Sequence, residues 1–241
     1  NNNDVNLTTS AAASAIYGIN NAATGNLIVD NNTIQLNNTI TNSGIFGYIY
    51  NSSAAASITV SISNNNFVGS GLLISTGALY LIYNNSSQLT PGITNVSGNS
   101  LEGVLTRTST TGATYGYYNN GSPTGTENVF NNVFDSITVN ASGSAAVYGY
   151  LSTTAAGATH NFYNNIFSAI TATGTGTVYG IHRTLASGSV YGNTITNLTS
   201  GGTVWGLSNG TGNVRIYQNN VYNLTSTSTG STAGLVSGLY F

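Results

Sequence analysis

The chain carries only five carboxylates, and two of them stand at equivalent places in neighbouring copies of a repeated motif. Glu102 follows Asn99 by three residues, and Asp135 follows Asn132 by the same interval. Strands stacked in register lie about 4.8 Å apart, which would suit the paired carboxylates of a retaining glycosidase. No further polar residues that could assist catalysis can be placed beside the pair. We therefore keep Glu102 and Asp135 as weak catalytic candidates in a chain that we expect not to be an enzyme.

The other groups suited to proton transfer or metal binding are scattered. His160 lies five residues before Asn165, whereas His182 lies three residues after Tyr179, which predicts different strands of adjacent coils. A zinc site needs at least three protein ligands, and no third ligand accompanies these two. The chain has no Cys, so thiolate sites are excluded as well. We expect His160, His182 and Arg183 to be solvated polar residues, and we predict neither a metal site nor a cofactor.

Charge is almost missing from the composition. Only 3% of the 241 residues are charged and the net charge is −2, so no basic surface is available for nucleic acid or anionic lipid. Apolar runs are only a few residues long, which argues against membrane insertion. Apolar residues nevertheless make up 40% of the chain and recur at regular places, which argues against disorder.

The regularity comes from a motif that recurs seven times: an apolar residue, any residue, a small polar residue, Asn, any residue and a second apolar residue. Its Asn residues are Asn32, Asn65, Asn99, Asn132, Asn165, Asn193 and Asn219. Asn tolerates the left-handed backbone region better than any residue except Gly. We therefore expect it to turn the chain at one corner of every coil. Stacked turns would let the side-chain amides hydrogen-bond as a ladder.

The apolar residues on either side of this Asn are never charged, which predicts two columns of side chains inside the coils. The first column is Val29, Ile62, Val96, Val129, Phe162, Val190 and Ile216. The second column is Ile34, Phe67, Leu101, Phe134, Phe167, Ile195 and Val221.

A second motif runs in phase with the first and reads apolar, aromatic, Gly, apolar. Its aromatic residues are Tyr17, Phe46, Tyr80, Tyr115, Tyr148, Tyr179 and Trp205. Alternation along a strand places each aromatic residue on the same face as the residue two positions later. Because that companion is apolar, we predict that the aromatic stack points inward. The alternative is an exposed aromatic stripe, suited to glycan stacking or lateral association.

Each repeat thus holds three short strand-like segments bounded by Gly, Asn and Ser. A period near 30 residues with three strands predicts a right-handed parallel β-helix of about seven coils, whereas a WD40 propeller blade needs about 40 residues. We assign residues 1–241 to a single β-helix repeat domain. Residues 1–7 and 231–241 fit strands of further coils, so we expect a segment of a longer chain, truncated at both ends.

The segments Thr-Val-Tyr-Gly-Ile (177–181) and Asn-Thr-Ile-Thr-Asn-Leu-Thr (193–199) carry a resemblance. The chain resembles the low-charge right-handed β-helix repeat regions of secreted and cell-surface proteins of Bacteroidetes-type bacteria, which are adhesin-like and commonly exported by the type IX system. The resemblance implies an extracellular or cell-surface location. It also implies that Ser136, in Asp-Ser-Ile, is an O-glycosylation site of the kind these bacteria use.

These observations favour a structural or adhesive role as a stalk, surface filament or adhesin segment. Self-association, contact with neighbouring repeats of the same chain, or multivalent surface contact would be its mode of action. The alternative is a glycan-binding or polysaccharide-degrading β-helix module. An ice-binding surface is a third reading, because Thr138, Thr171, Thr199 and Thr225 would stack.

Overall fold

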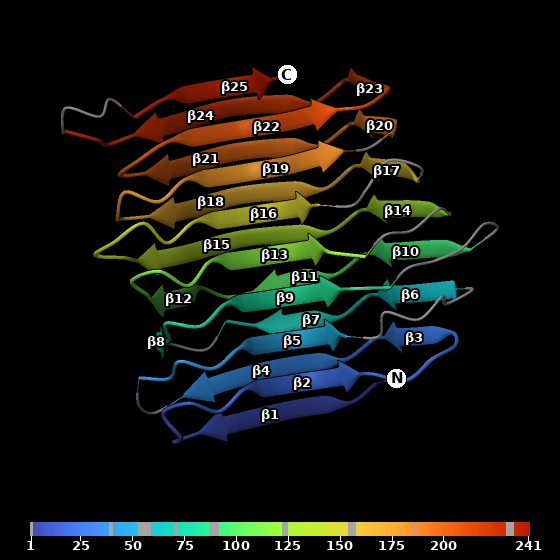
Figure 1. The fold of residues 1–241 in the computed structure, drawn as a ribbon, viewed down its shortest axis with the longest axis vertical. Coiled ribbons are helices and arrows are strands. Elements are labelled where there is room, and N and C mark those ends of the chain that lie inside the picture. Colours follow the sequence, from blue (N-terminus) through green and yellow to red (C-terminus); the bar gives the residue numbers. More distant parts are fainter. Residues whose placement is uncertain are drawn as a thin grey trace.

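The computed structural model is a parallel β-helix in which each coil contains three strands (Figure 1). It describes residues 2–38, 41–52, 59–69, 72–86, 92–121, 125–153, 158–185, 187–229 and 234–241. Strands are the only regular secondary structure in these ranges, and every pairing between them is parallel. This confirms the predicted fold class.

The chain visits three sheets in turn, and each sheet runs along the whole stack of coils (Figure 1). Sheet B contains β2 (Ile16–Asn21), β5 (Phe46–Asn51), β9 (Leu79–Asn84), β13 (Thr114–Asn119), β16 (Val147–Ser152), β19 (Val178–Leu185), β22 (Val204–Thr211) and β25 (Val236–Tyr240). Sheet C contains β3 (Leu27–Asp30), β6 (Thr59–Ser63), β10 (Ile93–Ser97), β14 (Thr126–Phe130), β17 (Thr159–Tyr163), β20 (Ser187–Tyr191) and β23 (Val214–Tyr217). The seven strands of sheet C match the seven motif copies.

Sheet A closes each coil. It contains β1 (Asp4–Thr9), β4 (Thr33–Asn38), β7 (Asn66–Val68), β11 (Ser100–Glu102), β15 (Val133–Asn140), β18 (Ile166–Ala172), β21 (Thr194–Ser200) and β24 (Asn220–Ser226), with β8 (Leu72–Ile74) and β12 (Leu105–Thr108) pairing beside them. Positive φ angles at Gly103, Ser136, Ala169, Asn197 and Asn223 bend this sheet at the same place in successive coils.

Two columns of apolar side chains fill the interior, as the repeats predict. Val129 pairs with Val96 on one side and with Phe162 on the other, and all three are buried. Phe134 pairs with Phe167 in the next coil, and Phe167 pairs with Ile195. Each such side chain contributes about 1.5–3 kcal/mol by leaving water, so the columns hold the coils together along the whole stack.

The corner between sheets C and A differs from the prediction in one respect. Positive φ angles occur at the residue before each motif Asn, for example at Asn31 (56°), Asn64 (54°) and Asn131 (55°). Gly98 and Gly192 fill the same position in two coils, each with a φ of 64°. The expectation that the motif Asn itself is left-handed is therefore wrong. The left-handed residue turns the chain from sheet C into sheet A, and the residue after it can then direct its amide into the interior.

The aromatic stack of sheet B also faces the other way. Tyr115 and Tyr148 are only half-buried, whereas Thr114 and Tyr117 on either side of Tyr115 are buried. The alternation of inward and outward residues fails at the Gly of the motif. A Cβ on Gly116 would lie 2.9 Å from Cδ2 of the buried Phe134, so this position faces the interior. Gly116 and Tyr117 therefore both face inward, and the predicted inward aromatic stack is wrong.

Phe46 is the exception, since it is fully buried. Ile16 pairs with Phe46 and Tyr17 pairs with Gly47, so this copy of the motif is shifted by one residue. Phe46 therefore belongs to the interior column of Ile16 and Leu79 rather than to the tyrosine column.

Candidate functional site

The amides of the motif Asn residues form a continuous ladder inside the corner between sheets C and A. Nδ2 of Asn132 donates to Oδ1 of Asn165 at 2.9 Å, and Nδ2 of Asn99 donates to Oδ1 of Asn132 at 2.9 Å. Each backbone N–H donates to the same acceptor, for example from Asn132 to Asn165 at 3.0 Å. The members, in order along the stack, are Asn3, Asn32, Asn65, Asn99, Asn132, Asn165, Asn193 and Asn219.

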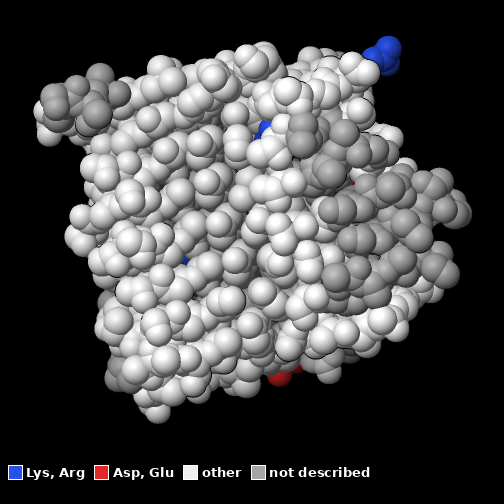
Figure 2. Space-filling model, viewed as in Figure 1, with Lys and Arg blue, Asp and Glu red and all other residues white. Residues whose placement is uncertain are grey.

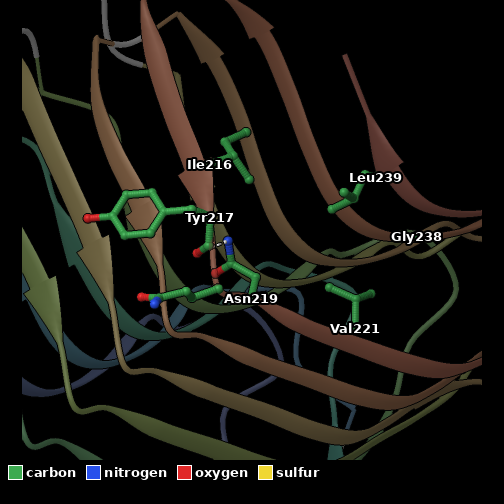
Figure 3. Close-up of a pocket in the computed structure, with 7 residues that line it drawn as sticks. Ile216, Tyr217, Asn219, Val221, Gly238 and Leu239 are labelled. Carbon is green, nitrogen blue, oxygen red and sulfur yellow. Dashed lines mark hydrogen bonds between the residues drawn. The ribbon is translucent and has the colours of Figure 1, made fainter.

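The last rung of this ladder borders a hollow at the C-terminal end of the described stack (Figure 3). Nδ2 of Asn219 donates to the carbonyl of Tyr217 at 3.1 Å. The ring of Tyr217 points to the opposite side from Ile216, Val221 and Leu239 (Figure 3). Those three apolar residues continue the interior columns, and Tyr217, Gln218, Asn219 and Gly238 complete the lining, so no carboxylate, imidazole or amine lines this hollow.

A second amide column, which the sequence analysis missed, lies where sheet B ends. Nδ2 of Asn21 donates to Oδ1 of Asn51 at 2.8 Å, and Nδ2 of Asn51 donates to Oδ1 of Asn84 at 2.8 Å. Asn119 follows in register but turns its amide to Glu127 instead. The signal was an Asn three or four residues after the motif Gly in three coils (Asn21, Asn51 and Asn119), with Asn84 at the equivalent place in the copy that lacks the Gly.

Glu127 and His160 form a buried polar centre between sheets B and C. Glu127 is 0% exposed and His160 is 2% exposed, and Nδ1 of His160 lies 2.5 Å from Oε2 of Glu127. Oε1 of Glu127 accepts hydrogen bonds from the hydroxyl of Tyr117 and, at 2.7 Å, from Nδ2 of Asn119. The hydroxyl of Tyr150 donates to Oε2 at 3.2 Å. The expectation that His160 is solvated is therefore wrong.

These partners keep the carboxylate ionised. Burial by itself would raise the pKa of Glu127, but the adjacent His160 and the hydrogen bonds of His160, Tyr117 and Asn119 outweigh it, so the pKa is lowered. An ionised carboxylate only accepts hydrogen bonds, so Nδ1 of His160 carries the hydrogen. Burial and the nearby carboxylate raise the pKa of Tyr117 and that of Tyr150 far above their usual range.

Both residues of this pair lie five residues before a motif Asn, which are Asn132 and Asn165. They therefore share one column in adjacent coils, and Glu127 indeed pairs with His160 in register. That common offset was the signal that could have predicted the contact. The centre is closed to solvent, so its groups hold two sheets together and cannot receive a substrate as they stand.

Arginine side chains are buried in two places. Nη2 of Arg183 donates to the carbonyl of Ser187 at 3.2 Å, while its Nε and Nη1 have no hydrogen-bond partner among the described residues. Burial lowers the pKa of Arg183. Nη1 of Arg107 donates to the carbonyl of Ala113 at 2.8 Å, and its Nη2 donates to that of Gly77. The expectation of a solvated Arg183 is wrong for the same reason as for His160.

The weak catalytic candidates Glu102 and Asp135 lie outside, at the bend of sheet A. Ser100 pairs with Val133, which places the two carboxylates in neighbouring coils at equivalent positions. Glu102 is exposed and accepts a hydrogen bond from Nδ2 of Asn66 at 2.5 Å. The positive φ of Ser136 (54°) follows Asp135 directly. The described side chains include no group of three His, Cys, Asp or Glu that could hold a metal ion.

Aromatic rings cover the outer face of sheet B. We call this surface the tyrosine face; its members are Tyr17, Tyr50, Tyr80, Tyr83, Tyr115, Tyr118, Tyr148, Tyr179, His182, Trp205 and Tyr240. Ring centroids of Tyr115 and Tyr148 are 5.2 Å apart and the rings are 8° from parallel. Those of Tyr148 and Tyr179 are 4.8 Å apart at 3°. His182 belongs to this face and is half-buried, whereas we expected it from the sequence to be solvated.

Two other outward columns repeat along the stack. On sheet C, the rings of Phe130, Tyr163, Tyr191 and Tyr217 stack at 4.9 to 5.0 Å. On sheet A, Thr138 pairs with Thr171 as predicted, and the column is Thr106, Thr138, Thr171, Thr199 and Thr225. Ionic groups are rare and isolated on the face shown in Figure 2.

Comparison of the chain with models of known protein families finds no match, and neither a curated protein nor a solved structure matches it. The described part of the chain has no helix long and apolar enough to cross a membrane. The function is therefore inferred from the arrangement of the side chains.

Proposed function

We propose that the chain is a structural or adhesive solenoid of a cell-surface or secreted protein, a stalk, surface filament or adhesin segment. One observation carries this proposal: the reactive groups of Glu127, His160, Arg107 and Arg183 are buried inside, while the outer faces repeat polar and aromatic side chains and carry only isolated charges. Such faces suit many weak contacts made at once. The repeat resemblance to Bacteroidetes-type surface proteins supports this location, and Ser136 would be an O-glycosylation site.

The partners we propose are further copies of the chain, neighbouring repeats, or glycans on a surface. A bead assay tests this. Beads coated with the chain should cluster with one another or stay on a polysaccharide-coated surface, and retention should rise steeply with coating density because the contacts are multivalent. Beads that neither cluster nor stay at any density would contradict the proposal.

A glycan-degrading module is the second candidate, favoured only by the neighbouring positions of Glu102 and Asp135. Incubation with uronate and neutral polysaccharides should release no reducing or unsaturated sugar. Release that disappears in the Glu102→Gln, Asp135→Asn double variant would replace our proposal with an enzymatic one.

A further inference from the structure

The tyrosine face on sheet B combines large aromatic area with an absence of formal charge. The outward residues of its two columns include neither Asp, Glu, Lys nor Arg along the described strands. His182 is the one titratable base, and burial lowers its pKa, so it is uncharged at neutral pH. Burial and the neighbouring tyrosines raise the pKa of Tyr148 to about 12. A partner that covers this face therefore meets no ionic group that would need a counter-charge.

The orientation of the rings limits what that partner can be. Tyr80 and Tyr115 have centroids 4.9 Å apart and lie 7° from parallel. Two rings lying side by side in one plane would need a larger centroid distance, because their nearest carbon atoms must stay about 3.5 Å apart. The rings must therefore overlap face to face with an offset. Each ring face is therefore partly covered by the next ring, which disfavours a sugar lying flat on successive rings.

The period of the face limits the partner further. Ring spacings of 4.8 Å for Tyr148 and Tyr179, and of 5.2 Å for Tyr115 and Tyr148, follow the distance between stacked strands. A partner that touches every rung must repeat at the same interval over the same length. A second copy of this chain meets that condition by construction.

The area of the face is sufficient for a stable contact. Eight strands at about 4.8 Å and about six residues at 3.3 Å give a surface of about 34 by 20 Å. That is about 680 Å² per copy, close to the roughly 800 Å² that each partner contributes to a standard protein interface.

We propose that two copies of the chain associate side by side through the tyrosine faces of sheet B. This inference rests on the proposed function and names one partner for it. The same surface is used on both copies, so the contact is isologous and closes at a dimer, unlike a heterologous contact that would grow into a fibre.

Sedimentation velocity over a concentration series tests the proposal. The unmodified chain should form a dimer, and the Tyr115→Lys, Tyr148→Lys variant should bind its own copies about 100-fold or more weakly, because each copy would bury two unpaired ammonium groups. The matched control is Tyr163→Lys, Tyr191→Lys, which disrupts the equivalent stack on sheet C (4.9 Å, 4°) and should leave the dimer intact. Circular dichroism verifies folding; Tyr115→Thr, Tyr148→Thr replaces the first variant if it does not fold, and should also weaken the dimer.

Three results would overturn the proposal: a monomer at all concentrations, a dimer lost in the sheet C control instead, or a dimer unchanged in both sheet B variants. A monomeric chain whose beads still adhere to polysaccharide through the tyrosine face would identify a glycan as the partner, leaving the adhesive function in place. A monomer whose beads adhere to nothing would contradict both proposals.

Discussion

Replacing Asn132 by Ala should be among the most damaging single changes at the corners between sheets C and A, because this buried residue is an internal member of the ladder. Its Oδ1 accepts from the backbone N–H and from Nδ2 of Asn99, at 3.0 and 2.9 Å. Its Nδ2 donates to Oδ1 of Asn165 at 2.9 Å and to the carbonyl of Val96 at 2.9 Å. Ala can make none of these bonds.

The magnitude follows from the groups left behind. Nδ2 of Asn99 keeps a bond to the carbonyl of Ile62, but the buried N–H of Asn99 loses its acceptor. An orphaned buried donor costs about 1–3 kcal/mol, and each remaining bond contributes about 1 kcal/mol. Asn132→Ala should therefore lower the free energy of unfolding by about 3–5 kcal/mol. The exposed Asn140 makes no side-chain hydrogen bond within the described residues, so Asn140→Ala should change the same quantity by less than about 0.5 kcal/mol.

Urea denaturation followed by circular dichroism measures both variants. The neighbouring position supplies a second comparison, since Asn131 has a φ of 55°. Asn131→Gly should be nearly neutral, as Gly98 and Gly192 show at equivalent positions, whereas Asn132→Gly should be as damaging as Asn132→Ala. Equal midpoints for Asn132→Ala and Asn140→Ala would refute the ladder as a source of stability. A stable Asn132→Gly would refute the placement of the turn.

Three further changes probe the interior. Because the pKa of Glu127 is lowered, its contribution to stability is present above the ordinary value of 4.5 and is lost as pH falls through the lowered pKa. The melting temperature of Glu127→Gln should therefore fall less than that of the unmodified chain between about pH 6 and pH 3. Parallel curves of melting temperature against pH would contradict this role of Glu127. Arg107→Lys keeps the charge but loses the fork that reaches Ala113, so thermal melting should show a loss of about 2–4 kcal/mol; an unchanged melting temperature would exclude that role. In Gly149→Ala the new Cβ would lie 2.3 Å from Cδ1 of Phe167, and denaturation should show a cost of about 1–3 kcal/mol, whereas a neutral result would mean that the ring moves freely.

Sequence reasoning could not predict the direction of several side chains, although it placed all of the aromatic residues except Phe46 in the right column. Tyr115 and Tyr148 share a column, as the motif implies, but they face outward. Strict alternation assumes an unbroken strand, and the assumption fails at Gly116, where the rings that fill the interior from sheet A leave no room for a side chain. The direction of these tyrosines depends on the space left inside the closed coil, and the sequence of a single repeat does not show that space.

The spacing of the repeats was enough to assign residues to shared columns, with Phe46 as the exception. Parallel coils stacked in register bring equivalent positions of successive repeats together, so the spacing of Asn99, Asn132 and Asn165 alone implied their ladder. Which columns meet across the interior depends on how the coils close in three dimensions. Glu127 and Tyr117 belong to different sheets, and their contact depends on how the three sheets close around the core. Burying a carboxylate is costly unless partners surround it, and those partners come together only when the coil is closed.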